Sequence, residues 1–252
     1  MTLLELQSRI QDARALDFGD IFNKSIELFK KVWVQGLVML LLTMVMMLPL
    51  YLLMYLPMIA AGFIDPSMFE YGYEPSPILM APFFLLMLVF SFVGMVISFG
   101  MKASFYRICK MKDLNEMGSE DYFYYLKKPY LGKVMRLALI SFGIALLATL
   151  LCVIPIFYVM VPLTLMNVIF AFNPELSASE IVKAGFDLGN KKWLITFGLM
   201  VVSGFLAGIV GMLMCFVGVY ITASFSYLPA YYIYKDAVGF DKSDEMKQIE
   251  KF

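Results

Sequence analysis

Four long stretches without any charged residue are the feature that most constrains how this chain can fold. They cover 32–64, 75–101, 137–174 and 193–234. A transmembrane helix needs about 20 predominantly apolar residues, so each stretch can cross a bilayer. The two longest, 137–174 and 193–234, would make straight helices of roughly 55–65 Å, about twice the hydrocarbon thickness. We therefore predict that each of these two is a hairpin, with turns at Pro155 and Gly218.

This division predicts an all-α integral membrane protein with six transmembrane helices, in a single polytopic membrane domain over 1–252. The spans are expected at about 34–60, 78–101, 134–153, 156–172, 194–214 and 218–235. The segment before the first stretch, 1–31, mixes acids and bases and lacks the apolar region of a cleavable signal peptide. The first span is therefore expected to act as an uncleaved anchor.

All 20 basic residues fall on one side of this six-span arrangement. Five precede the first span, eight lie in 102–136, three lie in 183–192, and four follow from residue 235 onward. The opposite connections carry none, and the first of them carries Asp65, Glu70 and Glu74. Cytoplasmic loops of membrane proteins are enriched in Lys and Arg. We therefore expect both termini on the cytoplasmic side of a bacterial inner membrane.

The segments that enter the first, third and fifth spans are typical of amphipathic helices lying in the cytoplasmic interface. We expect these interfacial helices at about 18–31, 119–130 and 178–190. Each is followed by an aromatic anchor at the membrane boundary: Trp33, Tyr130 and Trp193. Ser177 and Glu180 are expected to form a capping box that opens the third helix.

The first and third of these segments align with each other without a gap. The identical positions are Leu16 with Leu176, Ile21 with Ile181, Leu28 with Leu188, Lys31 with Lys191 and Trp33 with Trp193. The segment before the third span repeats only the Lys-Lys pair and a following aromatic residue. The pattern predicts an interfacial helix followed by a membrane hairpin, built three times. The alternative is that Lys-Lys-Trp simply marks where membrane helices enter the bilayer.

The second half of the chain carries several short motifs that also occur together in a known family. They are Ile154-Pro155-Ile156, Asn173-Pro174-Glu175-Leu176-Ser177-Ala178, Lys191-Lys192-Trp193, and a Gly-rich span that ends at Tyr234-Lys235-Asp236. In these motifs the chain resembles an uncharacterised bacterial family of six-span membrane proteins, related to the membrane domain of glycerophosphodiester phosphodiesterases. The resemblance covers the last hundred residues best. It implies the six-span fold and carries over no catalytic residue.

The composition argues against several classes of chemistry. The chain is 61% hydrophobic and has a net charge of zero, so it offers no basic surface for nucleic acid. It has no histidine and only three cysteines, and the interiors of the predicted spans carry no charge. His-ligated metals, His-dependent catalytic pairs and four-thiolate clusters are thereby excluded. We expect no catalytic, cofactor-binding or metal site.

The remaining candidate residues are polar or small side chains in the predicted spans. Asn167 in the fourth span either lines a polar cavity or makes an interhelical hydrogen bond. The fifth span carries a row of small residues: Ser203, Gly204, Ala207, Gly208 and Gly211. This row is either a dimerisation face or a packing face within the monomer. Cys152 and Cys215 fall near the outer turns, where they either pair or stay free.

These features favour a non-enzymatic inner-membrane protein, an accessory or scaffold subunit of a membrane protein complex. Its expected partners are membrane lipids and other inner-membrane proteins. The alternative is a protein that binds or transports lipids or other hydrophobic small molecules, which requires no charge within the membrane. A third hypothesis, an intramembrane enzyme, is disfavoured because ionisable groups within the membrane are the usual mark of such chemistry.

Overall fold

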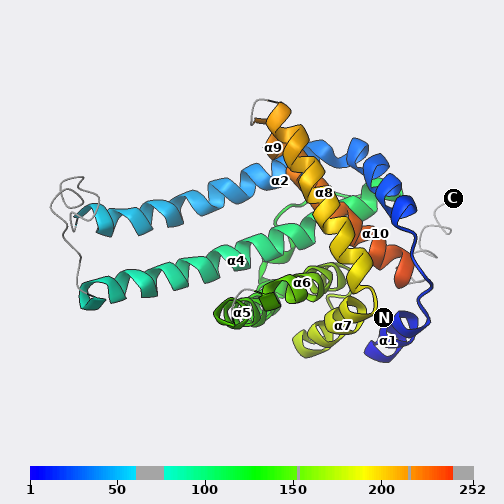
Figure 1. Ribbon diagram of the computed structural model, residues 1–252, viewed down its shortest axis with the longest axis horizontal. Helices are drawn as coiled ribbons and strands as arrows, with labels where there is room; N and C mark the ends of the chain where they lie inside the picture. Colours follow the sequence, from blue (N-terminus) through cyan, green and yellow to red (C-terminus); the bar gives the residue numbers. More distant parts are fainter. Residues whose placement is uncertain (61–76, 152–153, 215–216, 241–252) are drawn as a thin grey trace.

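The computed structural model describes residues 1–60, 77–151, 154–214 and 217–240, and every regular element within these ranges is a helix (Figure 1). Five helices are long and apolar enough to cross a membrane. These are α2 (Phe18–Ala60), α4 (Pro77–Asp113), α5 (Lys128–Leu150), α6 (Ile154–Phe172) and α8 (Trp193–Leu213). The shorter elements are α1 (Leu3–Asp12), η1 (Tyr124–Leu126), α7 (Ala178–Lys191), α9 (Val217–Thr222), η2 (Ala223–Tyr227) and α10 (Leu228–Ala237). The long apolar helices indicate that the protein inserts into a membrane.

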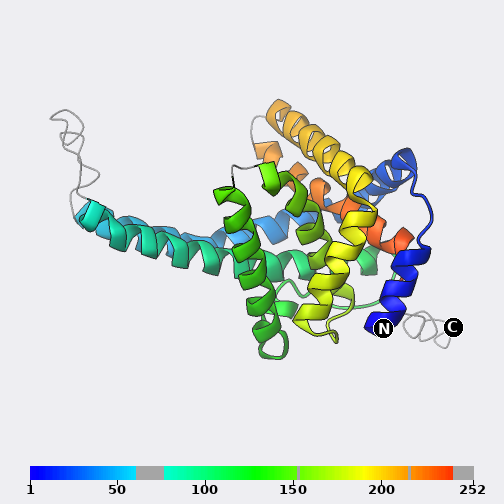
Figure 2. The same cartoon turned by 60° about the horizontal axis from the view of Figure 1, so that its bottom comes forward.

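Helices α2 and α4 lie side by side and extend away from the other helices as a two-helix arm (Figure 1 and Figure 2). The arm consists of the C-terminal part of α2 and the N-terminal part of α4. Only 6% of the most apolar window of α2 and 11% of that of α4 are buried. Helix α5 crosses the direction of the arm in both views (Figure 1 and Figure 2). The long helices therefore do not form one parallel bundle.

Helix α6 lies at the centre of the helical body. Its most apolar window is 56% buried, and α4, α5, α7 and α10 pack around it. Every residue of 165–171 is buried. Within that segment, the ring of Phe170 lies 5.7 Å from Phe99 on α4 and 4.9 Å from Tyr125 in η1. These distances are typical of favourable aromatic pairs, so α6 is fixed against the end of α4.

The sixth predicted span, 218–235, is not a single helix. Three short elements, α9, η2 and α10, cover it. Pro229 in the first turn of α10 explains the break, because proline has no N–H and its ring excludes a helical carbonyl four residues earlier, at Phe225. The hydroxyl of Thr222 also donates to the carbonyl of Ala207 at 2.7 Å, which ties α9 to α8. The described chain thus has five uninterrupted long helices and a broken segment in place of the sixth.

Two of the predicted interfacial helices differ from the structure. The segment 18–31 is the first part of α2, which continues through Trp33 without a break. The segment 119–130 is not an amphipathic helix: it contains a turn and the short η1, and α5 begins at Lys128. The reason is local, since the carboxylate of Asp121 accepts a hydrogen bond from the backbone N–H of Phe123 at 3.1 Å. Such a bond favours a turn over a helix.

The third predicted interfacial helix, 178–190, corresponds to α7. Ser177 and Glu180 form the capping box at its start. Its apolar face is covered by protein, however, because Ile181 and Leu188 are fully buried and α7 packs along α6. The helix expected at 178–190 is therefore present with its apolar face against protein, and its position at the membrane interface stays a prediction.

Helix α1 ties the N-terminus to the body, which the sequence did not predict. The Nε2 of Gln7 donates to the carboxylate of Asp187 on α7 at 2.8 Å. The guanidinium of Arg9 donates to the carbonyls of Val238 and Phe240 at 3.2 and 3.1 Å. The start of the chain and the segment that follows α10 are thus held together.

Candidate binding cavity

A cavity of about 520 Å³ lies between α4, α5, α6, α8 and η2. Most of its wall is apolar, and representative wall residues are Met95, Ala145, Ile156, Val159, Met160 and Met200. The volume falls within the ~300–1,000 Å³ that is usual for sites that take small molecules. Four of the five elements around the cavity are helices long enough to cross a membrane.

Among the described residues that line the cavity, Lys102 on α4 is the one with a formal charge. Its ammonium lies 4.9 Å from the ring centroid of Tyr227, a distance typical of a cation–π contact. Within the described ranges, no carboxylate lies within ion-pair distance of it. The sequence places Lys102 just after the second span, but α4 continues to Asp113. Lys102 therefore lies within a long helix and beside the cavity.

Asn167 on α6 brings an amide to the same part of the wall. Its Nδ2 donates to the backbone carbonyl of Phe99 at 2.9 Å, so the side chain bridges α6 and α4 while it lines the cavity. Asn167 is only 5% exposed, and its Oδ1 has no hydrogen-bond partner in the described part of the chain. A buried acceptor without a partner costs about 1–3 kcal/mol. A ligand that donates a hydrogen bond to this oxygen would recover that cost.

Three other hydroxyls on the wall donate to carbonyls of their own helices. Ser141 donates to the carbonyl of Leu137 at 2.8 Å, Thr164 to Met160 at 2.8 Å and Ser226 to Ala223 at 2.7 Å. Each of these hydroxyls uses its hydrogen for the carbonyl of the preceding turn and does not donate to another group. Among the described polar groups of the wall, the ammonium of Lys102 thus has no carboxylate partner and the Oδ1 of Asn167 has no hydrogen-bond partner.

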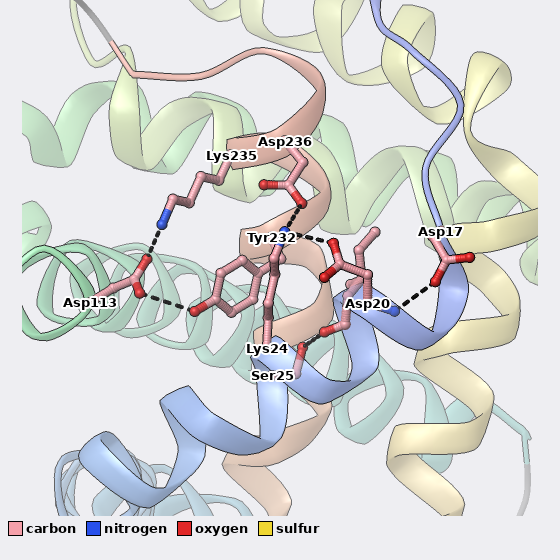
Figure 3. Close-up of polar contacts among 9 residues, drawn as sticks. Asp17, Asp20, Lys24, Ser25, Asp113, Tyr232, Lys235 and Asp236 are labelled. Carbon is pink, nitrogen blue, oxygen red and sulfur yellow. Dashed lines mark hydrogen bonds and ion pairs between the residues drawn. The ribbon is translucent and has the colours of Figure 1, made fainter.

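A separate polar cluster lies at the C-terminal end of α4 (Figure 3). The carboxylate of Asp113 accepts hydrogen bonds from the hydroxyls of Tyr231 and Tyr232 at 2.7 and 3.0 Å. It also pairs with the ammonium of Lys235 at 2.6 Å. With three donors on a side chain that is only 12% exposed, Asp113 is fully satisfied. We interpret this cluster as a structural tie between α4 and α10.

The start of α2 joins the same end of the molecule. Lys24 pairs with Asp20 at 2.6 Å and with Asp236 of α10 at 3.0 Å (Figure 3). The carboxylate of Asp17 accepts the backbone N–H of Asp20 at 2.7 Å, which satisfies a free donor in the first turn of α2. Three segments that the charge pattern assigns to one side of the membrane are therefore in contact: the start of α2 and the ends of α4 and α10.

The row of small residues on α8 divides into two faces. The buried members are Ser203, Ala207 and Gly211. A Cβ on Gly211 would lie 2.6 Å from the Cα of Val219, so glycine is required where α8 meets α9. A Cβ on Gly204 or Gly208 would meet nothing within 4 Å. Gly204 and Gly208 therefore do not pack within the monomer, because they lie about 100° around the helix from the buried row, and a dimerisation face at these two glycines stays a prediction.

The three predicted aromatic anchors lie in different settings. Trp33 is 41% exposed on an unbroken part of α2. Trp193 is the first residue of α8, where its Nε1 donates to the carbonyl of Tyr158 at 3.1 Å and its ring stacks on Phe197 at 4.8 Å. Tyr130 lies near the start of α5, in an aromatic cluster with η1. Their position at a bilayer surface stays a prediction, but the two tryptophans do not occupy equivalent sites.

Sequence reasoning missed a close contact between α7 and α6. A Cβ on Gly185 would lie 2.8 Å from the Cβ of Met166, and a Cβ on Gly189 would lie 2.9 Å from the Cα of Pro162. The available signal was the spacing of the two glycines, since small residues four apart let helices approach closely. This contact supports the face of α6 that lies away from the cavity.

The described part of the chain holds no group of three acids or cysteines placed to bind a metal ion. Cys109 is a buried free thiol on α4. Cys152 and Cys215 lie outside the described residues, so both alternatives, a disulfide or two free thiols, stay predictions. The expected absence of catalytic and cofactor sites likewise stays a prediction.

Comparisons with protein-family models, with curated proteins and with solved structures found no match to this chain. The resemblance to a bacterial six-span family therefore rests on the sequence motifs alone. Function has to be argued from the cavity and from the arrangement of the helices around it.

Proposed function

We propose that this membrane protein binds a hydrophobic or amphipathic small molecule in the cavity between α4, α5, α6, α8 and η2. The observation that carries the proposal is the cavity itself, about 520 Å³ with a largely apolar wall. Concave, mostly apolar sites with a few polar groups are the usual form of small-molecule sites. This is the alternative hypothesis from the sequence, and the cavity favours it over a purely structural role.

The membrane setting of the cavity supports the class of ligand. The side chains of Ala145, Ile156 and Met160 belong to helices long and apolar enough to lie in the bilayer. Hydrophobic molecules are concentrated in that environment, so a site of moderate affinity would be filled there. The proposed activity is binding or transfer, and it requires no catalytic group.

The topology that goes with this proposal has six crossings, with both termini on the cytoplasmic side of a bacterial inner membrane. The sixth crossing would be the broken segment α9–η2–α10, since interrupted helices are tolerated in membranes where they are buried in protein. The contacts of Asp113 with Lys235 and of Lys24 with Asp236 support a common side for the segments they join. The burial of both Ile21 and Ile181, aligned in the proposed repeat, supports two of its three units.

A photolabelling experiment tests the proposed function. The full chain in phosphatidylcholine nanodiscs is irradiated with a neutral long-chain alcohol that carries a diazirine, and the labelled peptides are identified by mass spectrometry. We expect labels on the cavity segments of α4, α5 and α6. Ala145→Trp should block them by filling the cavity, whereas Leu139→Trp, on an exposed position of the same helix, should not.

Labels spread evenly over all lipid-exposed helices, unchanged by Ala145→Trp, would contradict the proposal. A loss of labelling in both tryptophan variants would show a general effect on α5, and it would contradict the assignment of the label to the cavity.

One observation favours the accessory or scaffold role as a second candidate. The arm of α2 and α4 buries almost none of its apolar surface within the chain. Such a surface suits contact with lipid or with another membrane protein. A photo-crosslinking residue at Tyr51 on the arm should then give a discrete adduct in native membranes, whereas one at Leu139 on α5 should not. Lipid adducts alone at Tyr51 would remove the support for this role.

A further inference from the structure

We infer that the ligand of the cavity is an amphipathic molecule with one alkyl chain and an anionic headgroup, a carboxylate or a phosphate, that pairs with the ammonium of Lys102. This inference rests on the proposed function and adds the chemistry of the headgroup. Its basis is the contrast between one unpaired cation and an otherwise apolar wall.

Two other described lysines each pair with a carboxylate. Lys235 pairs with Asp113 at 2.6 Å, and Lys24 pairs with Asp20 at 2.6 Å. Within the part of the chain that the structure describes, Lys102 has no such carboxylate, and its ammonium lies over the ring of Tyr227. A partly buried charge in apolar surroundings is costly unless it is paired. An anion in the cavity would supply the missing partner.

The polar groups gather at one end of the cavity. Asn167 donates to the carbonyl of Phe99, which lies one helical turn before Lys102 on α4, so both polar side chains lie along the same stretch of α4. On α6 the wall continues to Ile156, three helical turns from Asn167, or ~16 Å along the helix. Near that far end the wall is formed by residues such as Ile156 and Val159. A polar end and an apolar end match a headgroup and a chain.

The size of the cavity favours a ligand with one chain. About 520 Å³ lies within the usual range of sites that hold a single small ligand. The unpartnered Oδ1 of Asn167 adds a requirement for a donor. A fatty acid offers only the anion, whereas a lysophosphatidate offers the phosphate together with a glycerol hydroxyl.

Equilibrium binding to the full chain in phosphatidylcholine nanodiscs tests the inference. The radiolabelled probes are oleate, oleoyl lysophosphatidate and neutral 1-oleoylglycerol, each corrected for partition into empty nanodiscs. We expect saturable binding of both anions, tighter than that of 1-oleoylglycerol by about tenfold or more. Tighter binding of lysophosphatidate than of oleate would identify the phosphate and hydroxyl headgroup, and the reverse order would identify a carboxylate.

Substitutions of Lys102 test whether this residue is the source of the preference for anionic probes. Lys102→Gln should lower the affinity for both anions by about tenfold more than it changes the affinity for 1-oleoylglycerol, and so abolish the preference for anions, while Lys102→Arg should retain the preference. Lys31→Gln is the matched control, because it removes an equal charge from an exposed position on α2. Size-exclusion profiles and the apparent Tm of each variant, compared with those of the wild type and of Lys31→Gln, show whether each variant is folded.

Failure of the inference and failure of the proposed function would give different binding results. Equal saturable affinity for all three probes, unchanged by Lys102→Gln, would overturn the anionic headgroup and leave the proposed function intact. An anion preference that survives Lys102→Gln would assign it to another cation and overturn the inference as well. No saturable binding of any probe would overturn both the inference and the proposed function.

Discussion

Adding a methyl group to the glycines of α7 should loosen its contact with α6 and destabilise the protein. In Gly185→Ala/Gly189→Ala the new Cβ atoms would start 2.8 Å from Met166 and 2.9 Å from Pro162, both on the central helix. Overpacking of this kind costs about 1–3 kcal/mol per site, and the better helix propensity of alanine returns about 1 kcal/mol. We therefore expect the double variant to lose roughly 2 kcal/mol of stability.

The matched control adds the same two methyl groups to α8. In Gly204→Ala/Gly208→Ala each Cβ meets open space, so only the gain in helix propensity remains, about 1 kcal/mol per site. One kcal/mol corresponds to about 2–4 °C in a chain of this size. The apparent Tm in one detergent and at one scan rate should thus fall by about 4–8 °C for the α7 pair and stay or rise for the α8 pair. Equal shifts in the same direction would refute the α6–α7 contact and the reasoning from it.

Three further predictions concern the polar end of the molecule and the topology. Three donors surround the carboxylate of Asp113, and Asp113→Asn replaces one of its two acceptor oxygens with a donor. We expect this variant to lower the free energy of unfolding by about 1–3 kcal/mol, measured by thermal unfolding. The control, Asp12→Asn at the exposed end of α1, should leave the free energy of unfolding unchanged. The hydrogen bond from Lys112 lowers the pKa of Glu120 below its usual range. The ionised Glu120 therefore stabilises the fold above its unfolded pKa of about 4.3, and this stabilisation is lost as the pH falls through the lower pKa of the folded state. In Glu120→Gln, the free energy of unfolding should depend less steeply on pH in this acid range. The predicted topology places Glu70 outside the membrane and Lys112 inside. A cysteine in place of Glu70 should react with an impermeant maleimide added from outside, whereas a cysteine in place of Lys112 should react only after the membrane is broken. Equal reactivity at the two positions would exclude the six-span topology.

The sequence predicted the long apolar helices well and the broken one poorly. Charge-free runs long enough to cross the bilayer indicate membrane helices because the hydrophobic requirement of the bilayer overrides local preferences. The segment 218–235 meets that requirement equally, but Pro229 and the contacts of Thr222 divide it. The expectation for 119–130 failed for a related reason, since the hydrogen bond from Phe123 to Asp121 stabilises a turn that a pattern of apolar residues does not reveal.

The candidate site was only partly accessible from the sequence. Asn167 was identified because an amide in an apolar span is unusual, and the structure places it both in an interhelical hydrogen bond and on the cavity wall. Lys102 was treated as the end of a span, because nothing in the sequence shows that α4 continues to Asp113. The packing face of α8 depends on which side of the helix meets α9, a tertiary property that separates Gly211 from Gly208.

The central claim is that the cavity holds one small amphipathic molecule, and identification of the molecules that accompany the protein tests it most directly. The chain is extracted from its native membrane in polymer nanodiscs, and the bound molecules are quantified by mass spectrometry against those of empty membrane discs. The account predicts about one single-chain amphipath per protein, enriched over the surrounding membrane, in the wild type and in Leu139→Trp. It predicts a loss of that molecule in Ala145→Trp, where the indole fills the cavity. No enriched molecule, or the same enrichment in Ala145→Trp, would contradict the account.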